Sequence, residues 1–285
     1  MGVPIVKVND INIAYTERGK GEAVVLIMGL GAVKESWFMN IPTLSKYYRV
    51  VTFNSRGVGK TDRSGEFYTM GRMAADTVGL LDVLGIDKAH IVGVSLGSMI
   101  AQEIAINFPQ RVGRLILAAT TPGMSDAANK EMWDKKIVEI RRRTGMGEDF
   151  DERIVSDPGS FDVVKIMVRI TAYAFNRLVF RIPMVLGARY YFNKVGPSGV
   201  LDQLRAVSKH NTIDRLDQIK AQTLVMAGTD DKIVPVEFSR IVAQHIPNAE
   251  FIEFKKGSHS FFMEMSKRFN REVIEFLKGT PPVAK

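Results

Sequence analysis

Cysteine is absent from this chain of 285 residues. Its absence excludes disulfide bonds, a thiol nucleophile, and zinc or iron–sulfur centres held by cysteine. Four histidines are present without the short spacings of metal ligands, so no metal site is expected. The longest apolar run, Ala23 to Met28, is too short to cross a bilayer, and the start MGVPIVKVND lacks the shape of a signal peptide. These absences predict a soluble, cytoplasmic protein without integral membrane contact.

The composition that remains is that of an ordinary globular protein, with 46% hydrophobic and 25% charged residues. Lysine and arginine outnumber the acids 39 to 31, which gives a net charge of +8. No recognition motif accompanies this charge, so we expect no nucleic-acid partner. The length fits one large domain, or one domain with an insertion, as a monomer or a homodimer.

Short apolar segments alternate with helical patterns through much of the chain, after an opening that predicts two antiparallel strands. Continuous apolar runs are typical of strands that are covered on both faces, as in a parallel sheet. The runs are AVVLIM, YRVVTF, HIVGV, RLILAA, TLVMA and EFIEF, and helical periodicity appears around 70–84, 97–107, 236–245 and 266–278. The pattern predicts an α/β fold with a mostly parallel, doubly wound sheet.

The alternation stops between Pro122 and about His210, where the periodicity is helical and no strand is evident. We therefore predict a core in two parts, 1–122 and 211–285, with an inserted all-helical cap at 123–210. An insertion at the edge where loops leave the sheet would lie over a ligand site, because α/β sheets bind ligands at the carboxyl ends of their strands. The alternative is a helical layer without function.

A G-x-S-x-G motif, Gly93-Val94-Ser95-Leu96-Gly97, lies between a predicted strand and a predicted helix. A serine on such a sharp turn is held in a strained backbone conformation, and the flanking glycines allow close packing. The hydroxyl of Ser95 would then stand exposed above the sheet. Ser95 is therefore a candidate nucleophile, and the alternative is a tight turn in which the serine is incidental.

A serine nucleophile needs a base, and the base needs an acid that fixes its tautomer. His259 follows the last predicted strand in the open loop KGSHS. Asp230 and Asp231 follow the strand TLVMA on a loop at the same edge of the sheet. We prefer Asp231 as the acid, because the D-x-x-V-P spacing places it where the turn leaves the strand.

The order Ser95, Asp231, His259 is the order of the α/β-hydrolases. Over nearly its whole length the chain resembles this family, in its serine carboxylesterase and lactonase branch with a helical cap. Further stretches that resemble the family are NSRGVGKTD at 54–62, LLDVLGI at 80–86 and AQEIA at 101–105. The resemblance implies the α/β-hydrolase fold and acyl transfer from an ester to water through Ser95, with no cofactor.

The resemblance also implies an oxyanion hole made of two backbone amides. One belongs to Leu96, after the nucleophile, and the other to Leu30 in the loop Met28-Gly29-Leu30-Gly31. Met28 stands where the family commonly has histidine, which leaves the bracing of this loop to be found. Apolar groups near these loops are expected to bind substrate, and the candidates are Gly29, Trp37, Phe261 and Phe262.

Esters of small to medium acyl chains are the expected small-molecule substrates. Eight basic residues and one acid between Val163 and Lys209 suggest an alternative, in which anionic acyl substrates such as acyl-CoA thioesters or carboxylated lactones bind the cap. CoA or acyl-CoA would then be a ligand, held by cations at four-residue multiples on one helix: Lys165, Arg169, Arg177 and Arg181. The same cations are equally explained by a solvated surface. A ligand receptor with a vestigial triad, a carbon–carbon hydrolase and a cofactor-free peroxidase also remain open.

Overall fold

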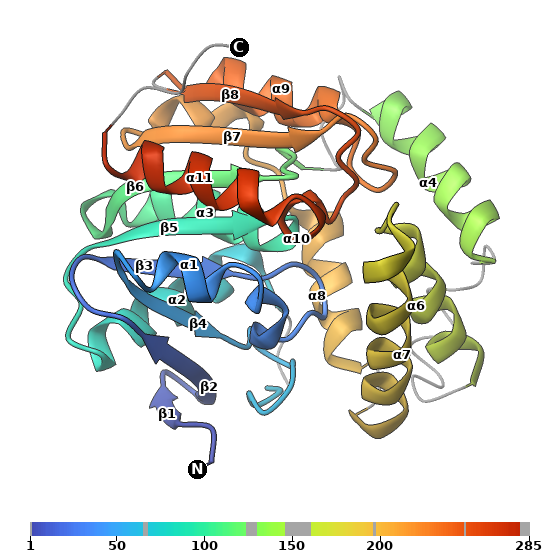
Figure 1. Cartoon of the computed structure of the whole chain (residues 1–285), viewed down its shortest axis with the longest axis horizontal. Coiled ribbons are helices and arrows are strands. Elements are labelled where there is room, and N and C mark those ends of the chain that lie inside the picture. Colours follow the sequence, from blue (N-terminus) through green and yellow to red (C-terminus); the bar gives the residue numbers. More distant parts are fainter. Residues whose placement is uncertain are drawn as a thin grey trace.

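The computed structural model describes residues 2–64, 68–123, 130–145, 161–195, 198–247 and 249–279. Within them, eight strands form one sheet in the order β1-β2-β4-β3-β5-β6-β7-β8 (Figure 1). The pairs β1–β2 and β2–β4 are antiparallel, and the other pairs are parallel. The strands are Ile5–Val8 (β1), Ile11–Arg18 (β2), Ala23–Ile27 (β3), Arg49–Phe53 (β4), Ala89–Val94 (β5), Val112–Ala118 (β6), Gln222–Gly228 (β7) and Ala249–Phe254 (β8). The predicted α/β class is confirmed.

Helices cover both faces of this sheet, which explains why its central strands are apolar throughout. Val25 and Ile27 of β3 face one core cluster, beneath α2, α3 and α9. Val24 and Leu26 face the other cluster, beneath α1, α10 and α11. These helices span Ile41–Leu44 (α1), Met70–Val83 (α2), Leu96–Asn107 (α3), Val236–His245 (α9), Phe261–Glu264 (α10) and Ser266–Leu277 (α11), with short 3-10 turns at Lys34–Trp37, Pro109–Arg111 and Ile213–Gln218.

The segment between β6 and β7 is mainly helical where the structure describes it, and the helices α4, α6 and α7 lie beyond the carboxyl ends of the parallel strands (Figure 1). The helix α8 packs against the core, where Ala206 belongs to the same cluster as β3. The bounds are Lys130–Thr144 (α4), Phe161–Tyr173 (α6), Leu178–Val195 (α7) and Ser198–Lys209 (α8).

The two ends of this inserted segment meet at the surface of the core. Gly123 and Asn211 form an isolated antiparallel bridge, and the backbone N–H of Thr212 donates to Pro122 O over 2.7 Å. Gly123 has a φ of +143°, and a Cβ at this position would lie 2.2 Å from the carbonyl oxygen of His210. Only glycine fits there. Because Gly123 and Asn211 are paired, the inserted segment begins and ends at adjacent points of the core.

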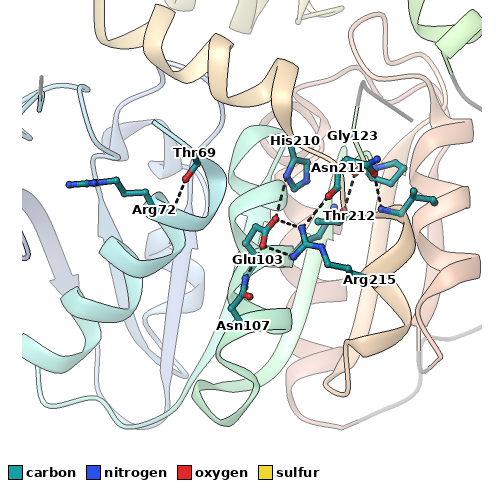
Figure 2. A network of polar contacts seen from close by, with 12 residues as sticks. Thr69, Arg72, Glu103, Asn107, Gly123, His210, Asn211, Thr212 and Arg215 are labelled. Atoms are coloured by element: carbon teal, nitrogen blue, oxygen red, sulfur yellow. Dashed lines mark hydrogen bonds and ion pairs between the residues drawn. The ribbon is translucent and has the colours of Figure 1, made fainter. Parts of the chain in front are cut away.

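A polar network lies behind this junction and ties it to α3 (Figure 2). Arg215 forms a bidentate pair with Glu103, at 2.7 and 3.0 Å, and Asn107 donates to the same carboxylate. Nδ1 of His210 lies 3.7 Å from Glu103 Oε1. Burial disfavours the charged form of Glu103, but the hydrogen bonds and charge of Arg215 outweigh it and hold its pKa below the ordinary value.

His210 should make the protein sensitive to acid. Burial lowers its pKa from 6.5 to about 4, so the ring is neutral in the folded protein and takes up a proton on unfolding below pH 6.5. The stability it contributes is therefore present above pH 6.5 and is lost as the pH falls towards 4. We expect it to account for about 2 kcal/mol of the fall in unfolding free energy between pH 7 and pH 5.

Urea unfolding of His210→Gln at these two pH values tests this expectation. The variant should lose less stability on acidification than the wild type does. His245→Gln is the matched control, because His245 is exposed on α9. This variant should lose as much unfolding free energy between pH 7 and pH 5 as the wild type does. Equal pH dependence in His210→Gln and the wild type would remove His210 as the source.

Candidate active site

Ser95 lies on a strained turn at the carboxyl end of β5, where the sheet meets α3. Its backbone has φ 55° and ψ −124°, a conformation that non-glycine residues rarely adopt. The turn is held in place because the N–H of Ser95 donates to Ala118 O of β6 over 2.9 Å. The side chain is half-buried and lines a cavity.

The two glycines of the motif are required by close backbone approaches. A Cβ on Gly93 would lie 2.2 Å from the carbonyl oxygen of Gly97. A Cβ on Gly97 would lie 2.2 Å from Ile27 O and 2.7 Å from Met28 O. Gly97, the second residue of α3, therefore packs directly on the end of β3, from which the loop Met28–Gly31 begins.

Gly97→Ala should destabilise the protein, because its methyl group would push against backbone that cannot move aside. We expect a loss of about 1–3 kcal/mol in unfolding free energy, measured by urea denaturation. Gly71→Ala is the matched control, since the nearest atom to its new Cβ is Thr69 Oγ1 at 4.0 Å. That change should be neutral or stabilising by up to about 1 kcal/mol. Equal effects of the two changes would contradict the packing argument.

His259 and Asp231 are in direct contact on neighbouring loops. His259 Nδ1 lies 2.8 Å from Asp231 Oδ2. The other carboxylate oxygen, Oδ1, accepts the backbone N–H groups of Ile233 and Val234 at 2.8 and 2.9 Å. Asp231 is thus buried and fixed, whereas Asp230 is exposed. This arrangement can hold the imidazole in one tautomer, with Nε2 left to accept a proton.

The loop after β3 brings backbone amides close to Ser95. A Cβ on Gly29 would lie 3.2 Å from the Cβ of Ser95 and 3.7 Å from its Oγ, so this loop passes directly beside the hydroxyl. Leu30 follows Gly29 and lines the same cavity. Leu96 opens α3, where the first N–H groups of a helix have no partner within the helix. Leu30 and Leu96 therefore lie on the two chain segments that adjoin Ser95.

Gln203 of α8 braces this loop, and no motif in the sequence pointed to it. Its buried Oε1 accepts the N–H of Gly31 over 2.9 Å, and its Nε2 donates to Arg56 O over 3.1 Å. Gln203 therefore holds the loop Met28–Gly31, in which Met28 stands where the family commonly has histidine. The one signal in the sequence is a polar residue on the apolar face of a helix.

Ser95 and His259 both line one cavity of about 430 Å³ between the core and the inserted helices. Most of its other lining is apolar, and Gly29, Leu30 and Phe262 contribute from the core. The inserted helices α6 and α7 supply Ile170, Thr171, Met184, Gly187 and Ala188. Among the described lining residues, Glu35 and His259 are the ones whose side chains titrate.

Two residues expected to bind substrate lie elsewhere. Trp37 and Phe261 are both 0% exposed and pack in the core beneath the cavity. The ring centre of Trp37 lies 5.1 Å from that of Phe262, and the ring centre of Phe261 lies 4.6 Å from that of Phe254. Phe261 and Phe262 are neighbours on a short helix, so their side chains diverge, and only Phe262 reaches the cavity.

The predicted stripe of four cations on one helix is also wrong. α6 ends at Tyr173 and α7 begins at Leu178, so Lys165 and Arg169 lie on one helix while Arg181 lies on the next. Arg177, between them, donates from its backbone N–H to Glu264 Oε1 over 2.5 Å and from Nη1 to Glu264 O over 2.9 Å. None of these four cations is among the described residues that line the cavity.

Within the described ranges, no group of three or more histidine, aspartate or glutamate side chains is arranged to hold a metal ion. In that same part of the chain, no helix combines the length and apolarity that crossing a membrane requires.

Known proteins share the fold described above. A family model described as the alpha/beta hydrolase fold matches residues 22–146. The chain is 29% identical over 280 residues to a 2-hydroxy-6-oxo-6-phenylhexa-2,4-dienoate hydrolase of Comamonas testosteroni, covering 95% of this chain and 92% of that protein.

Two solved structures superpose over nearly the whole chain. The enol-lactonase of Burkholderia xenovorans LB400 has a TM-score of 0.80 at 23% identity, covering 96% of this chain and all of that one. A bromoperoxidase of Bacillus anthracis has a TM-score of 0.80 at 24% identity, covering 97% and 100%. At these identities the structures establish a shared fold, while the names describe several chemistries. The chain has the α/β-hydrolase fold, and residues 22–146 match the model of that family.

Proposed function

We propose that this protein is a serine hydrolase that cleaves neutral carboxylic esters of small to medium acyl chains through an acyl-enzyme on Ser95. One observation carries the proposal. Ser95, His259 and Leu30 all line the apolar cavity of about 430 Å³. No lysine or arginine is among the described residues that line it. Such a cavity favours an uncharged ligand with an alkyl or aryl group.

The proposed reaction uses each side chain in turn. Asp231 holds the Nδ1–H tautomer of His259, and Nε2 accepts the proton of the Ser95 hydroxyl as its oxygen attacks the ester carbonyl. The oxyanion accepts hydrogen bonds from the amides of Leu30 and Leu96, each worth about 3–4 kcal/mol in the transition state. The alcohol leaves with the proton from His259. Water then attacks the acyl-enzyme with His259 as base and releases the acid.

The same cavity argues against an anionic substrate bound at the reacting centre. A carboxylate or phosphate buried there would need a partner, because an unpaired buried charge is strongly disfavoured. Arg169 and Arg181 instead line a separate, open hollow that α4, α6 and α7 form together. Salt should therefore change turnover little.

The test is the turnover of p-nitrophenyl esters from acetate to palmitate, at two salt concentrations, with acyl-CoA thioesters in parallel. The proposal expects an optimum at short to medium chains, little salt dependence and slow thioester cleavage. Faster, salt-sensitive cleavage of thioesters would move the substrate to the anionic class. Tight ligand binding without turnover in a folded protein would favour a receptor.

A further inference from the structure

The helix that roofs the cavity exposes apolar side chains on its outer side. Leu178, Val179, Ile182 and Leu186 of α7 are each more than half exposed, with Val179 at 69%. At about 100° per residue, these four positions fall within an arc of about 100°. We call them the outer α7 face. The opposite side of the same helix carries Met184, Gly187 and Ala188, which line the cavity.

A helix that is apolar on two opposite sides is normally buried on both. Here the inner side of α7 faces the cavity, while the outer α7 face is exposed to solvent. Clusters of exposed large apolar side chains on a globular protein mark sites of interaction. Val138 on α4, a helix that packs against α6, is also exposed, at 65%.

Cations gather beside this face. Arg142 and Arg143 of α4, Arg169 of α6 and Arg181 of α7 line one open hollow, together with Tyr173. Arg181 lies three residues after Leu178, about one turn along the same helix, so the hollow borders the outer α7 face on the side of Leu178. The nearby acid Glu139 is already engaged, since it accepts the hydroxyl of Tyr173 over 2.8 Å and pairs with Lys136.

We propose that the outer α7 face and the adjoining arginine hollow dock on the surface of an anionic lipid bilayer. The four apolar side chains would enter the boundary between headgroups and acyl chains, and the arginines would bind lipid phosphates. Apolar residues flanked by cations on a helix lying in the membrane plane are typical of interfacial binding. Each basic residue near the surface adds electrostatic attraction to anionic lipid.

Charge favours a lipid surface over a second copy of this chain. A two-fold dimer through this face would place the same patch on both copies opposite itself. The described residues of the outer α7 face and of the hollow include no acid, so a second copy would bring two positively charged hollows into one interface without a counter-charge. An anionic bilayer offers the complementary charge and also covers the apolar side chains.

Docking by α7 would place the cavity directly above the lipid. The substrates would then be apolar esters dissolved in the bilayer, a conclusion that rests on the proposed ester hydrolysis. The docking itself does not depend on that activity. We therefore design its test on the inactive protein.

The experiment is co-sedimentation of Ser95→Ala protein with vesicles of phosphatidylcholine alone or with phosphatidylglycerol. We expect binding to the anionic vesicles, weakened about tenfold by Ile182→Gln/Leu186→Gln. Arg142→Gln/Arg181→Gln should weaken binding similarly and reduce its salt dependence. Ile5→Gln/Val83→Gln is the matched control, because it removes two half-exposed apolar side chains far from the inserted helices, and it should bind like the parent.

Absence of binding to both kinds of vesicle would overturn the proposal, as would equal weakening by the control pair. A dimer in sedimentation velocity that Ile182→Gln/Leu186→Gln dissociates, without vesicle binding, would assign the face to a second copy instead. Activity on p-nitrophenyl esters is measured separately on the wild type. Failure of ester hydrolysis therefore leaves the docking result readable, and failure of docking leaves the ester result readable.

Discussion

Ser95→Ala is expected to lower kcat/KM for a short p-nitrophenyl ester by on the order of 10⁵-fold or more. The change removes the oxygen that would form the acyl-enzyme, while the amides of Leu30 and Leu96 and the cavity remain. Alanine keeps the Cβ, so the strain of the positive φ at this turn is unchanged. Thermal unfolding should therefore match that of the wild type, which separates lost chemistry from lost structure.

Ser95→Gly provides the complementary control for this experiment. Glycine adopts φ 55° without strain, so this variant should be as inactive as Ser95→Ala but more stable, by about 1 kcal/mol. Substantial turnover in either variant would remove Ser95 as the nucleophile and transfer the reaction to water or another group.

Asp231→Asn should lower kcat by about 10⁴-fold, with Asp230→Asn as the matched control. The buried carboxylate of Asp231 accepts from Ile233, Val234 and His259 at once. An amide cannot accept at both ends, so the backbone bonds would turn its NH₂ towards His259 and favour the tautomer that cannot take the proton from Ser95.

The carboxylate of Asp230 has no comparable set of hydrogen bonds in the described structure. It is exposed, and its carboxylate accepts the neighbouring Thr229 hydroxyl over a long 3.3 Å. Its replacement should change kcat less than about threefold, which initial-rate kinetics at saturating ester resolves. If Asp230→Asn lowers kcat more than Asp231→Asn does, Asp230 is the acid, and the hydrogen bond between Asp231 and His259 is structural.

The sheet could be predicted because its strands are covered on both faces, which forces continuous apolar runs such as Ala23 to Met28. Its covering helices were equally visible, since α11 must bury Phe269, Val273 and Phe276 on one side. The neighbourhood of Ser95, Asp231 and His259 followed from their places after parallel strands, whose carboxyl ends share one edge.

Tertiary contacts decide what the sequence could not show. The break between α6 and α7 contains neither glycine nor proline. It arises where Phe175 enters the core, Ser260 N–H donates to Ala174 O and Arg177 N–H donates to Glu264. No local pattern encodes such partners, so the cations on the two sides of the break were assigned to one helix. Trp37 was assigned to the substrate site for a similar reason. The sequence shows that an aromatic residue is near the site, but not whether its side chain lines the cavity or packs in the core below it.

The bridge between Gly123 and Asn211 has a consequence for how this chain can change in length. Because the core already holds both ends of the inserted segment together, closing a longer loop between them adds little entropy cost, about 0.6 kcal/mol for each doubling. Residues can thus be gained or lost over the cavity while the sheet keeps its stability. α8 is the exception, since Gln203 holds the loop Met28–Gly31 beside Ser95. Variation in substrate range should therefore concentrate before Ser198 and leave α8 unchanged.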